Sequence, residues 1–154
     1  VIDLPPGTGD VQLTLTQRAP LSGAVVVTTP QKVSLIDAEK GVRMFEQVKV
    51  PMLGIVENMS YFLCDGCDKK HYIFKEGGGK ALADKFKTPF LGGIPLINQV
   101  VEGGDSGVPV LISHPDSPAS QAYKSLAGQV AAQLSIVQSK EEKVGANFEL
   151  AWKG

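Results

Sequence analysis

The amino-acid sequence predicts an α/β fold, in which a parallel sheet carries helices on both faces. Short apolar runs alternate with amphipathic patterns of helical period along most of the chain. Strands that are apolar almost throughout are typical of parallel sheets, because helices cover both of their faces. The predicted strands are 23–29, 51–59 and 89–96, and the predicted helices are 34–48, 77–86, 98–103 and 118–137.

The first strand and the first helix have clear local support. "GAVVVTT" at 23–29 is rich in Val and Thr, which favour strands. In the segment 34–48, apolar residues at helical spacing form one stripe, and Ser34 is a suitable cap for the first turn. These features predict a strand followed by a helix that packs on the sheet.

The later elements are predicted in the same way. The helix at 77–86 has a glycine-rich start, and residues 98–103 predict a single helical turn. Pro118 suits the first position of the last helix. Proline has no backbone N–H, and the N–H at this position of a helix has no partner within the helix. The apolar pattern ends after Val137, so residues 139–154 are predicted to be a tail or linker.

Composition narrows the possible partners. The chain has 154 residues, of which 43% are hydrophobic and 20% charged, with a formal net charge of −1. This charge, and the lack of a basic tract, argue against a nucleic-acid partner, and no apolar run is long enough for a membrane span. Two cysteines are too few for a secreted disulfide scaffold, so we expect a reducing, cytoplasmic location. A mitochondrion or plastid is the alternative, since any targeting segment would lie upstream.

The first ten residues, "VIDLPPGTGD", combine a strand end with a glycine-rich turn. Asp3 stands where a carboxylate can hold Mg²⁺ beside a nucleotide phosphate, and Gly7 and Gly9 let a backbone approach a phosphate closely. A capped strand end followed by an ordinary turn is the simpler interpretation of Asp3 alone. Val1–Leu4 is too short to hold a place in a sheet, so we expect a fragment whose upstream part is missing.

This string resembles the switch II signature of the Mrp/ApbC-type P-loop ATPases. These are iron–sulfur cluster carriers of the deviant-Walker-A class, related to the MinD proteins and to the iron protein of nitrogenase. The resemblance continues through "AVVVTTPQKVSLIDAEKGVRMF", "VPMLGIVENMSYFLCDGC", "IFKEGGGKALA", "FLGGIPL" and "GDSGVPV". It implies a P-loop NTPase-like fold from which the N-terminal part, including the P-loop, is missing. Residues 1–138 are accordingly interpreted as the C-terminal part of this domain.

The resemblance also implies a function. Members of the family bind ATP between two subunits, hydrolyse it slowly, and pass a 4Fe–4S cluster to apoproteins. Asp3 matches the Walker B residue that binds Mg²⁺, Asn58 the residue that hydrogen-bonds adenine, and Pro95 a backbone position near the base. Without this context, Asn58 is an ordinary polar residue at a strand end. The switch II loop, which senses the γ-phosphate, matches Pro6, Gly7, Thr8, Gly9 and Asp10.

The sequence also departs from the family pattern. Neither a KGGxGK[ST]-like Walker A loop nor the switch I Asp that orients the attacking water is present. "KEGGGKA" at 75–81 has a similar composition, but Glu76 replaces a Gly and Ala81 replaces the Ser or Thr that would bind Mg²⁺. We interpret this string as a glycine-rich helix start. The chain alone is therefore not expected to hydrolyse ATP, so its activity as an enzyme is left undecided.

The two cysteines, Cys64 and Cys67, form a single C-x-x-C motif that permits several interpretations. A redox dithiol needs its first Cys at a helix N-terminus, and two flanking aspartates disfavour the thiolate. A zinc site could add His71, with His114 or water as the fourth ligand. A pair of buried structural cysteines is the simplest interpretation, but the polar residues around the motif predict an exposed loop.

The fourth interpretation is an iron–sulfur cluster. A 4Fe–4S cluster takes four thiolates, and one chain supplies only two. A twofold axis through the cluster would place the same motif of each subunit on opposite sides, and the resembling family uses the motif in this way. The prediction is a homodimer that holds a bridging cluster for apoprotein acceptors. The alternative is a non-hydrolysing, MinD-like scaffold that binds partners and has a structural zinc at its dimer interface.

Overall fold

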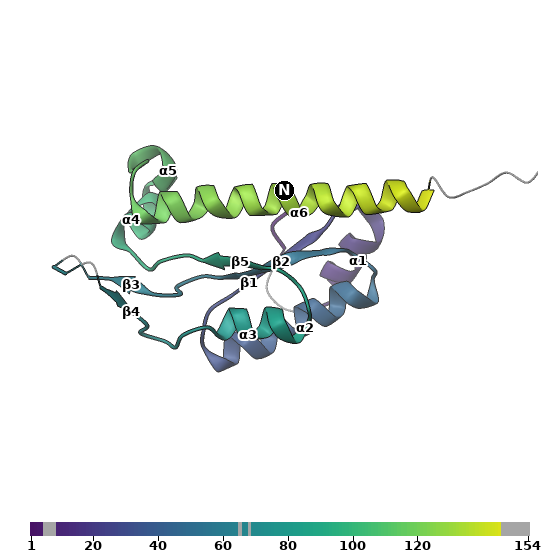
Figure 1. Cartoon of the computed structure of the whole chain (residues 1–154), viewed down its shortest axis with the longest axis horizontal. Helices are drawn as coiled ribbons and strands as arrows, with labels where there is room; N and C mark the ends of the chain where they lie inside the picture. Colours follow the sequence, from purple (N-terminus) through teal and green to yellow (C-terminus); the bar gives the residue numbers. More distant parts are fainter. Residues whose placement is uncertain (5–8, 65, 68, 146–154) are drawn as a thin grey trace, which may run out of the picture.

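A three-stranded parallel sheet forms the centre of the molecule (Figure 1). The computed structural model describes residues 1–4, 9–64, 66–67 and 69–145. The strands β1 (Ala24–Thr28), β2 (Met52–Glu57) and β5 (Phe90–Gly93) lie in the order β1–β2–β5. The predicted α/β class and the parallel sheet are confirmed.

Helices cover both faces of this sheet, as the sequence predicts (Figure 1). On one face, α2 (Lys32–Gln47) and α3 (Gly78–Lys85) pack against side chains such as Val26 and Ile55. On the other face, α6 (Pro118–Gly145) packs against Val56. The adjacent residues Ile55 and Val56 face opposite layers because side chains alternate along a strand.

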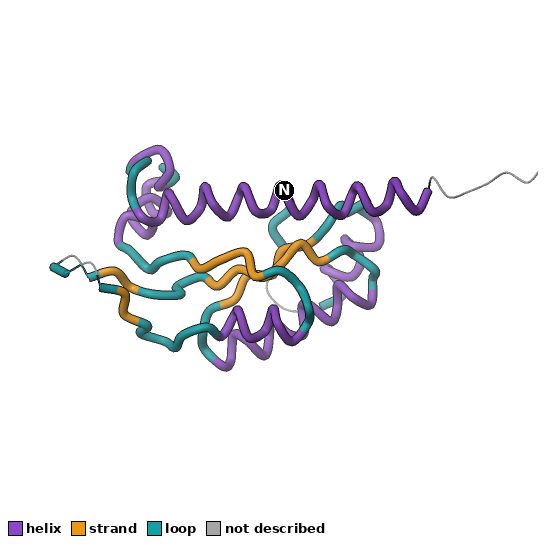
Figure 2. The backbone as a smooth tube through the Cα atoms, viewed as in Figure 1, coloured by secondary structure: helices purple, strands orange, loops and turns teal. Residues whose placement is uncertain are grey.

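The remaining elements lie at the ends of the sheet. The short strands β3 (Phe62–Leu63) and β4 (Lys70–His71) form an antiparallel hairpin beyond the carboxyl end of β2 (Figures 1 and 2). The other helices are α1 (Asp10–Arg18), α4 (Asn98–Ser106) and α5 (Val110–Ser113).

Several boundaries differ from the prediction. Helix α6 continues to Gly145, into the predicted linker, because its polar continuation contains good helix formers and no proline. Helix α2 begins at Lys32 with Gln31 as its cap, so the prediction of a Ser34 cap is wrong. The Ser34 hydroxyl instead shares a hydrogen bond with that of Thr29, at 2.8 Å. Helix α4 extends the predicted single turn to Ser106.

The segment Val1–Leu4 takes no place in the described sheet, as its short length predicts. Val1, Ile2 and Asp3 are exposed, and of these four residues only Leu4 packs against the core. Four residues offer few hydrogen bonds to a sheet, so this segment does not pair by itself. Among the described residues, no helix has the length and apolar character that a membrane crossing requires.

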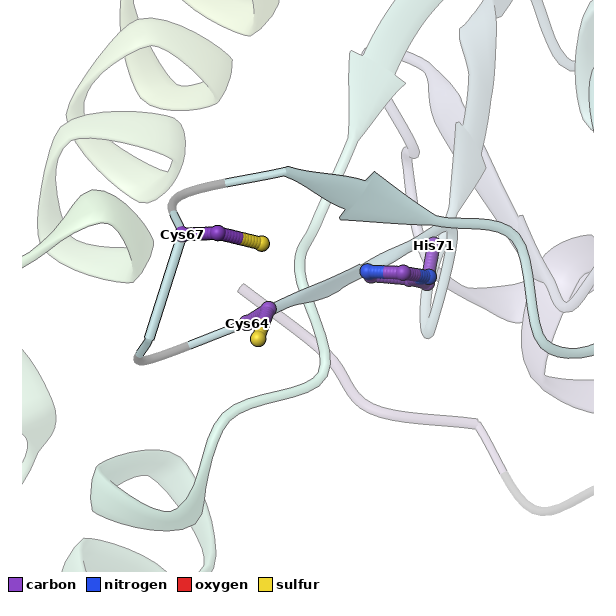
Figure 3. A group of neighbouring side chains, drawn as sticks. All are labelled: Cys64, Cys67 and His71. Carbon is purple, nitrogen blue, oxygen red and sulfur yellow. The ribbon is translucent and has the colours of Figure 1, made fainter.

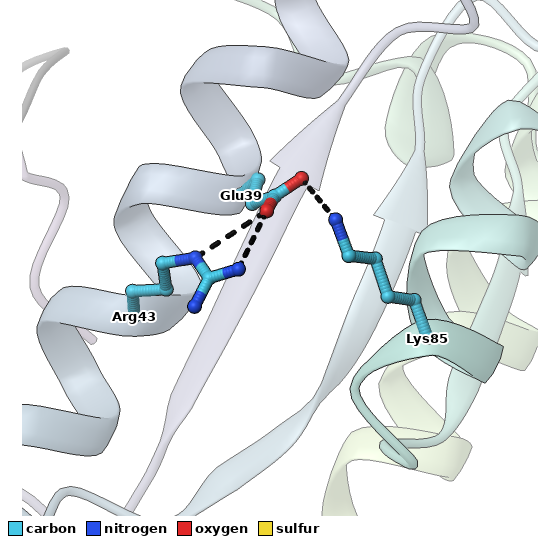
Figure 4. A network of polar contacts seen from close by, with 3 residues as sticks. All are labelled: Glu39, Arg43 and Lys85. Atoms are coloured by element: carbon cyan, nitrogen blue, oxygen red, sulfur yellow. Dashed lines mark hydrogen bonds and ion pairs between the residues drawn. The ribbon is translucent and has the colours of Figure 1, made fainter.

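A surface ion-pair network joins α2 to α3 (Figure 4). One carboxylate oxygen of Glu39 accepts from the Arg43 guanidinium at 2.9 Å, and the other accepts from Lys85 Nζ at 2.7 Å. These hydrogen bonds lower the pKa of Glu39 below its ordinary value of 4.5, and the bond from Lys85 has a larger effect than the bond from Arg43. The network therefore favours the docked helices when Glu39 is ionised.

Glu39→Gln should lower stability at neutral pH, and the difference should vanish in acid. A carboxyl group whose pKa is lowered by folding stabilises the protein above its unfolded pKa, near 4.5. This contribution is lost as the pH falls through the lowered, folded value. Urea unfolding of both proteins at about pH 7 and about pH 3 measures the change. Asp37→Asn is the control, since the Asp37–Lys40 pair is more exposed and lies within one helix.

Candidate metal centre and nucleotide edge

The carboxyl ends of the strands gather several of the predicted site residues. Asn58 follows β2, is half-buried, and donates its backbone N–H to Thr28 O at 2.7 Å. Its side-chain Oδ1 accepts from the N–H of Met59 at 2.9 Å, so the Nδ2 amino group of the amide points elsewhere. Pro95, beyond β5, is buried. The structure thus places Asn58 and Pro95 at the edge of the sheet where such folds bind ligands.

The predicted phosphate loop is only partly described. Pro6, Gly7 and Thr8 lie outside the described residues, whereas Gly9 caps α1 and Asp10 begins it. The structure does not bring the exposed Asp3 into the sheet. The roles of these residues in binding Mg²⁺ and phosphate therefore stay predictions.

The glycine-rich string 75–81 forms a helix start, as expected. Gly77 caps α3 in the left-handed region, with φ 73°, where glycine is the favoured residue. The N–H of Gly79, in the first turn, donates to the carboxylate of Glu57 at 2.5 Å. A donor already engaged by a carboxylate is not open to phosphate, which agrees with the interpretation of this string as structural.

The cysteine motif lies in the turn of the β3–β4 hairpin. Two backbone hydrogen bonds set this turn: Cys64 N–H donates to Lys69 O at 3.1 Å, and Cys67 N–H donates to Cys64 O at 3.3 Å. Pairing of Phe62 with His71 fixes the register of the stem. The exposed loop expected around the motif is confirmed, with Cys67 exposed and Cys64 half-buried.

The hairpin brings three possible metal ligands together (Figure 3). The sulfurs of Cys64 and Cys67 and a ring nitrogen of His71 all lie within 4.8 Å of one another. Thiolate and imidazole ligands of one tetrahedral zinc ion are about 3.5 Å apart, so small side-chain rotations suffice to bind it. The two thiols are equally suited to a cluster, whose irons take thiolate ligands.

Two of the four interpretations of the cysteines do not fit this geometry. A pair of buried structural cysteines is wrong, because Cys67 is exposed. A thioredoxin-like dithiol is also wrong, since Cys64 follows β3 in a hairpin and not a helix N-terminus. Neither cysteine is in a disulfide. His114, offered as a fourth zinc ligand, follows α5 as its C-cap and lies outside the three-residue group, with its Nδ1 at 3.1 Å from Ser113 Oγ.

Aromatic and charged side chains surround the stem of the hairpin. The rings of Tyr61 and Tyr72 meet edge to face with centroids 6.4 Å apart, and Lys70 Nζ lies 4.3 Å from the centroid of Tyr61. Desolvation raises the pKa of the Tyr72 phenol, and the carboxylate of Glu76 raises it further. The phenol therefore stays neutral, and packing of these rings stabilises the stem.

The structure gives two residues of this region a clearer place than their sequence pattern does. The sequence offered His71 only as an optional zinc ligand, and the structure places a ring nitrogen of His71 within 4.8 Å of both sulfurs. The sequence pattern gave no role to Glu57, a carboxylate that ends a buried strand and is only 1% exposed. A charged residue inside an apolar run is the signal that could have drawn attention to it.

Comparison with known proteins identifies the family. The model of the NUBPL iron-transfer P-loop NTPases (ParA) matches residues 1–131. The chain belongs to this family. Its predicted resemblance to iron–sulfur cluster carriers and its P-loop NTPase-like fold are thereby confirmed.

Relatives of this NUBPL-type chain include proteins from bacteria and eukaryotes. The iron–sulfur cluster transfer protein NUBPL of Dictyostelium discoideum is 49% identical over 143 residues, which are 93% of this chain and 44% of that protein. The iron–sulfur cluster carrier protein of Escherichia coli K12 is 54% identical over 134 residues, 87% of this chain and 36% of that protein. The chain thus spans less than half the length of these relatives.

Solved structures agree with the fold. A nucleotide-binding protein from Archaeoglobus fulgidus in complex with ADP is 43% identical, with a TM-score of 0.65 over 77% of this chain and 47% of that one. The cell division ATPase MinD of Pyrococcus furiosus is 24% identical, with a TM-score of 0.55 over 72% of this chain and 43% of that one. The second likeness supports the fold alone.

Proposed function

We propose that this chain is the C-terminal part of an ATP-dependent carrier that holds a 4Fe–4S cluster between two subunits and passes it to apoproteins. The observation that carries the proposal is the convergence of Cys64 and Cys67 in an exposed hairpin turn. The sequence contains two cysteines, and in this proposal a second copy supplies the remaining two thiolates. The names of the relatives, iron–sulfur cluster carrier and transfer proteins, support this cargo.

The exposed position of the site suits release of the cargo. Transfer exchanges the thiolates of Cys64 and Cys67 for thiolates of the acceptor, one bond at a time. Such exchange needs access for an incoming thiolate, and Cys67 is exposed. The Lys69 and Lys70 side chains are exposed beside the turn, where they offset the negative charge that four thiolates bring.

The nucleotide site of the proposed carrier combines several strand ends. Asp3 would hold Mg²⁺, Asn58 would hydrogen-bond adenine, and the Pro95 backbone would pack near the base. The switch II loop that contacts the γ-phosphate comprises Pro6, Gly7, Thr8, Gly9 and Asp10. The solved relative in complex with ADP supports a nucleotide as the ligand. We propose a cytoplasmic location for a bacterial source, and a mitochondrion or plastid for a eukaryotic one.

This chain alone should not hydrolyse ATP, because its sequence lacks a Walker A loop to hold the phosphates. Release of inorganic phosphate from Mg-ATP is the measurement, and we expect no rate above that of buffer. An established ATPase serves as the positive control of the assay. Turnover by the chain that is abolished by Asp3→Ala would contradict the proposal.

A structural zinc site in a MinD-like scaffold is the second candidate function. The observation in its favour is the ring of His71, which lies close to both sulfurs. Zinc binds two thiolates and an imidazole readily, and a water or a partner residue can complete the tetrahedron. Under this alternative, the protein binds partners and carries no cluster.

Anaerobic reconstitution with iron and sulfide distinguishes the two functions. A cluster carrier should turn brown, with a broad visible absorption from thiolate-to-iron charge transfer. A scaffold should stay colourless and retain zinc after dialysis. His71→Ala sharpens the result, since a bridging cluster needs only the thiolates, whereas a zinc site loses one of its three ligands.

A further inference from the structure

A buried carboxylate ends β2, directly before Asn58 and a few residues before the cysteine hairpin. Glu57, the last residue of β2, is 1% exposed. Its Oε1 accepts from Ser60 Oγ at 2.6 Å, and its Oε2 accepts from the N–H of Gly79 at 2.5 Å. The first donor belongs to the turn before the hairpin and the second to the first turn of α3. A carboxylate at a helix N-terminus is also favoured by the helix dipole.

Two glycines make this close arrangement possible. A Cβ atom at Gly79 would lie 2.9 Å from the Cβ of Glu57 and 3.2 Å from its Oε2. A Cβ atom at Gly93, the last residue of β5, would lie 2.6 Å from Ser60 Oγ. The Glu57 and Ser60 side chains therefore occupy space that any larger residue at 79 or 93 would fill.

Backbone hydrogen bonds join the same segment to its neighbours. Asn58 N–H donates to Thr28 O at 2.7 Å, and Ser60 N–H donates to Ile94 O at 3.0 Å. Leu96 N–H donates to Tyr61 O at 2.8 Å, one residue before the hairpin stem. The segment 57–61 is therefore hydrogen-bonded to the end of β1 on one side and to residues 94–96 on the other. Asn58 lies within this segment, and the hairpin stem directly follows it.

We propose that Glu57 is a positioning residue that fixes the cysteine hairpin relative to Asn58, and so couples the nucleotide edge to the metal site. Glu57 holds Ser60, and Ser60 precedes the stem that sets Cys64 and Cys67. A shift of Asn58 that displaces Glu57 would therefore also move Ser60 and the hairpin stem, and with them the cysteines. The coupling rests on the proposed function, because that function gives Asn58 and the cysteines their ligands.

Hydrogen exchange of the metal-free chain tests the positioning directly. The amides to follow are those of Asn58, Ser60, Cys64 and Leu96, all of which are hydrogen-bonded. In Glu57→Ala, we expect exchange at these four amides to become faster than in the wild type. This increase should be about tenfold larger than the increase at amides in the centre of α6. Val42→Ala is the matched control, because Val42 is fully buried on α2 and takes no part in the segment.

A purely structural role gives a different pattern. If Glu57 only stabilises the fold, Val42→Ala will change the same four amides as much as Glu57→Ala at equal loss of thermal stability, and the proposal fails. Should Glu57→Ala not fold, Ser60→Ala replaces it, since it removes only the link to the hairpin. Ser60→Ala must then speed exchange at Cys64 and Leu96, and unchanged rates there would overturn the proposal.

Binding of Co²⁺, a spectroscopic substitute for zinc and iron at thiolate sites, gives a second readout. Glu57→Ala should weaken Co²⁺ binding at Cys64 and Cys67 about tenfold, while Glu57→Gln, which retains an acceptor for Gly79 N–H, restores most of it. Equal affinity in Glu57→Ala and wild type would contradict the positioning role. If the wild-type chain takes up no cluster but the exchange result holds, the proposed cargo is wrong and the positioning role of Glu57 remains.

Discussion

Replacing either Cys64 or Cys67 with serine should abolish the brown colour of the reconstituted protein and its cluster-dependent dimer. In a cluster shared by two chains, one substitution removes two of the four thiolates, because each copy carries it. A serine hydroxyl is a poor substitute for a thiolate on iron. Visible absorption after anaerobic reconstitution and sedimentation of the same sample measure both effects.

His71→Ala is the matched control for the cysteine variants, since His71 lies in the same hairpin and near both sulfurs. We expect it to keep the colour and the dimer. A serine variant that still forms a coloured dimer would show that other residues bind the cluster. Loss of colour in the His71 variant equal to that in the serine variants would make the imidazole a ligand and favour the three-ligand site.

Gly54→Ala should destabilise the fold more than any other substitution considered for this chain. Gly54 lies in the central strand β2 with φ +152°, a conformation that residues with a side chain rarely adopt. Its added Cβ would lie 2.6 Å from both Leu91 Cγ and Pro89 O, and a backbone oxygen cannot move away easily. Strain and overpacking together predict a loss on the order of 4 kcal/mol in the free energy of unfolding.

Gly128→Ala provides the control for this prediction. Gly128 lies on the exposed side of α6, and an added Cβ there meets nothing within 4 Å. Because alanine favours a helix over glycine, this change should stabilise the protein by about 1 kcal/mol. Urea unfolding of the two variants and the wild type measures the difference. Equal stability of Gly54→Ala and wild type would mean that β2 and β5 pack differently from the structure described.

The pattern of apolar runs was sufficient to predict the central sheet and the helices on its faces. Runs such as "GAVVVTT" and the stripe on α2 are strong signals. A strand buried on both faces is apolar throughout, and a helix buried on one face has apolar residues at helical spacing. Helix α1 was missed since its pattern is weak and it contains two threonines. The polar end of α6 carried no apolar period at all, and only helix propensity indicated it.

The candidate site was predictable in its residues but not in its arrangement. Spacing identified Cys64 and Cys67, and the family resemblance identified Asn58. The approach of His71 depends on a hairpin with two residues in each strand, too short for a reliable alternation. The contact of Glu57 with Gly79 joins residues 22 positions apart, and it follows from the packing of α3 on β2. Such contacts become visible only once the fold is known.

Native mass spectrometry of the anaerobically reconstituted chain tests the central claim most directly. The account predicts a dimer whose mass exceeds that of two chains by one 4Fe–4S cluster, and which separates into monomers when the cluster is removed. A monomer that carries a single zinc ion, lost in His71→Ala, would contradict it. That result would assign Cys64, Cys67 and His71 to one structural metal site in each chain.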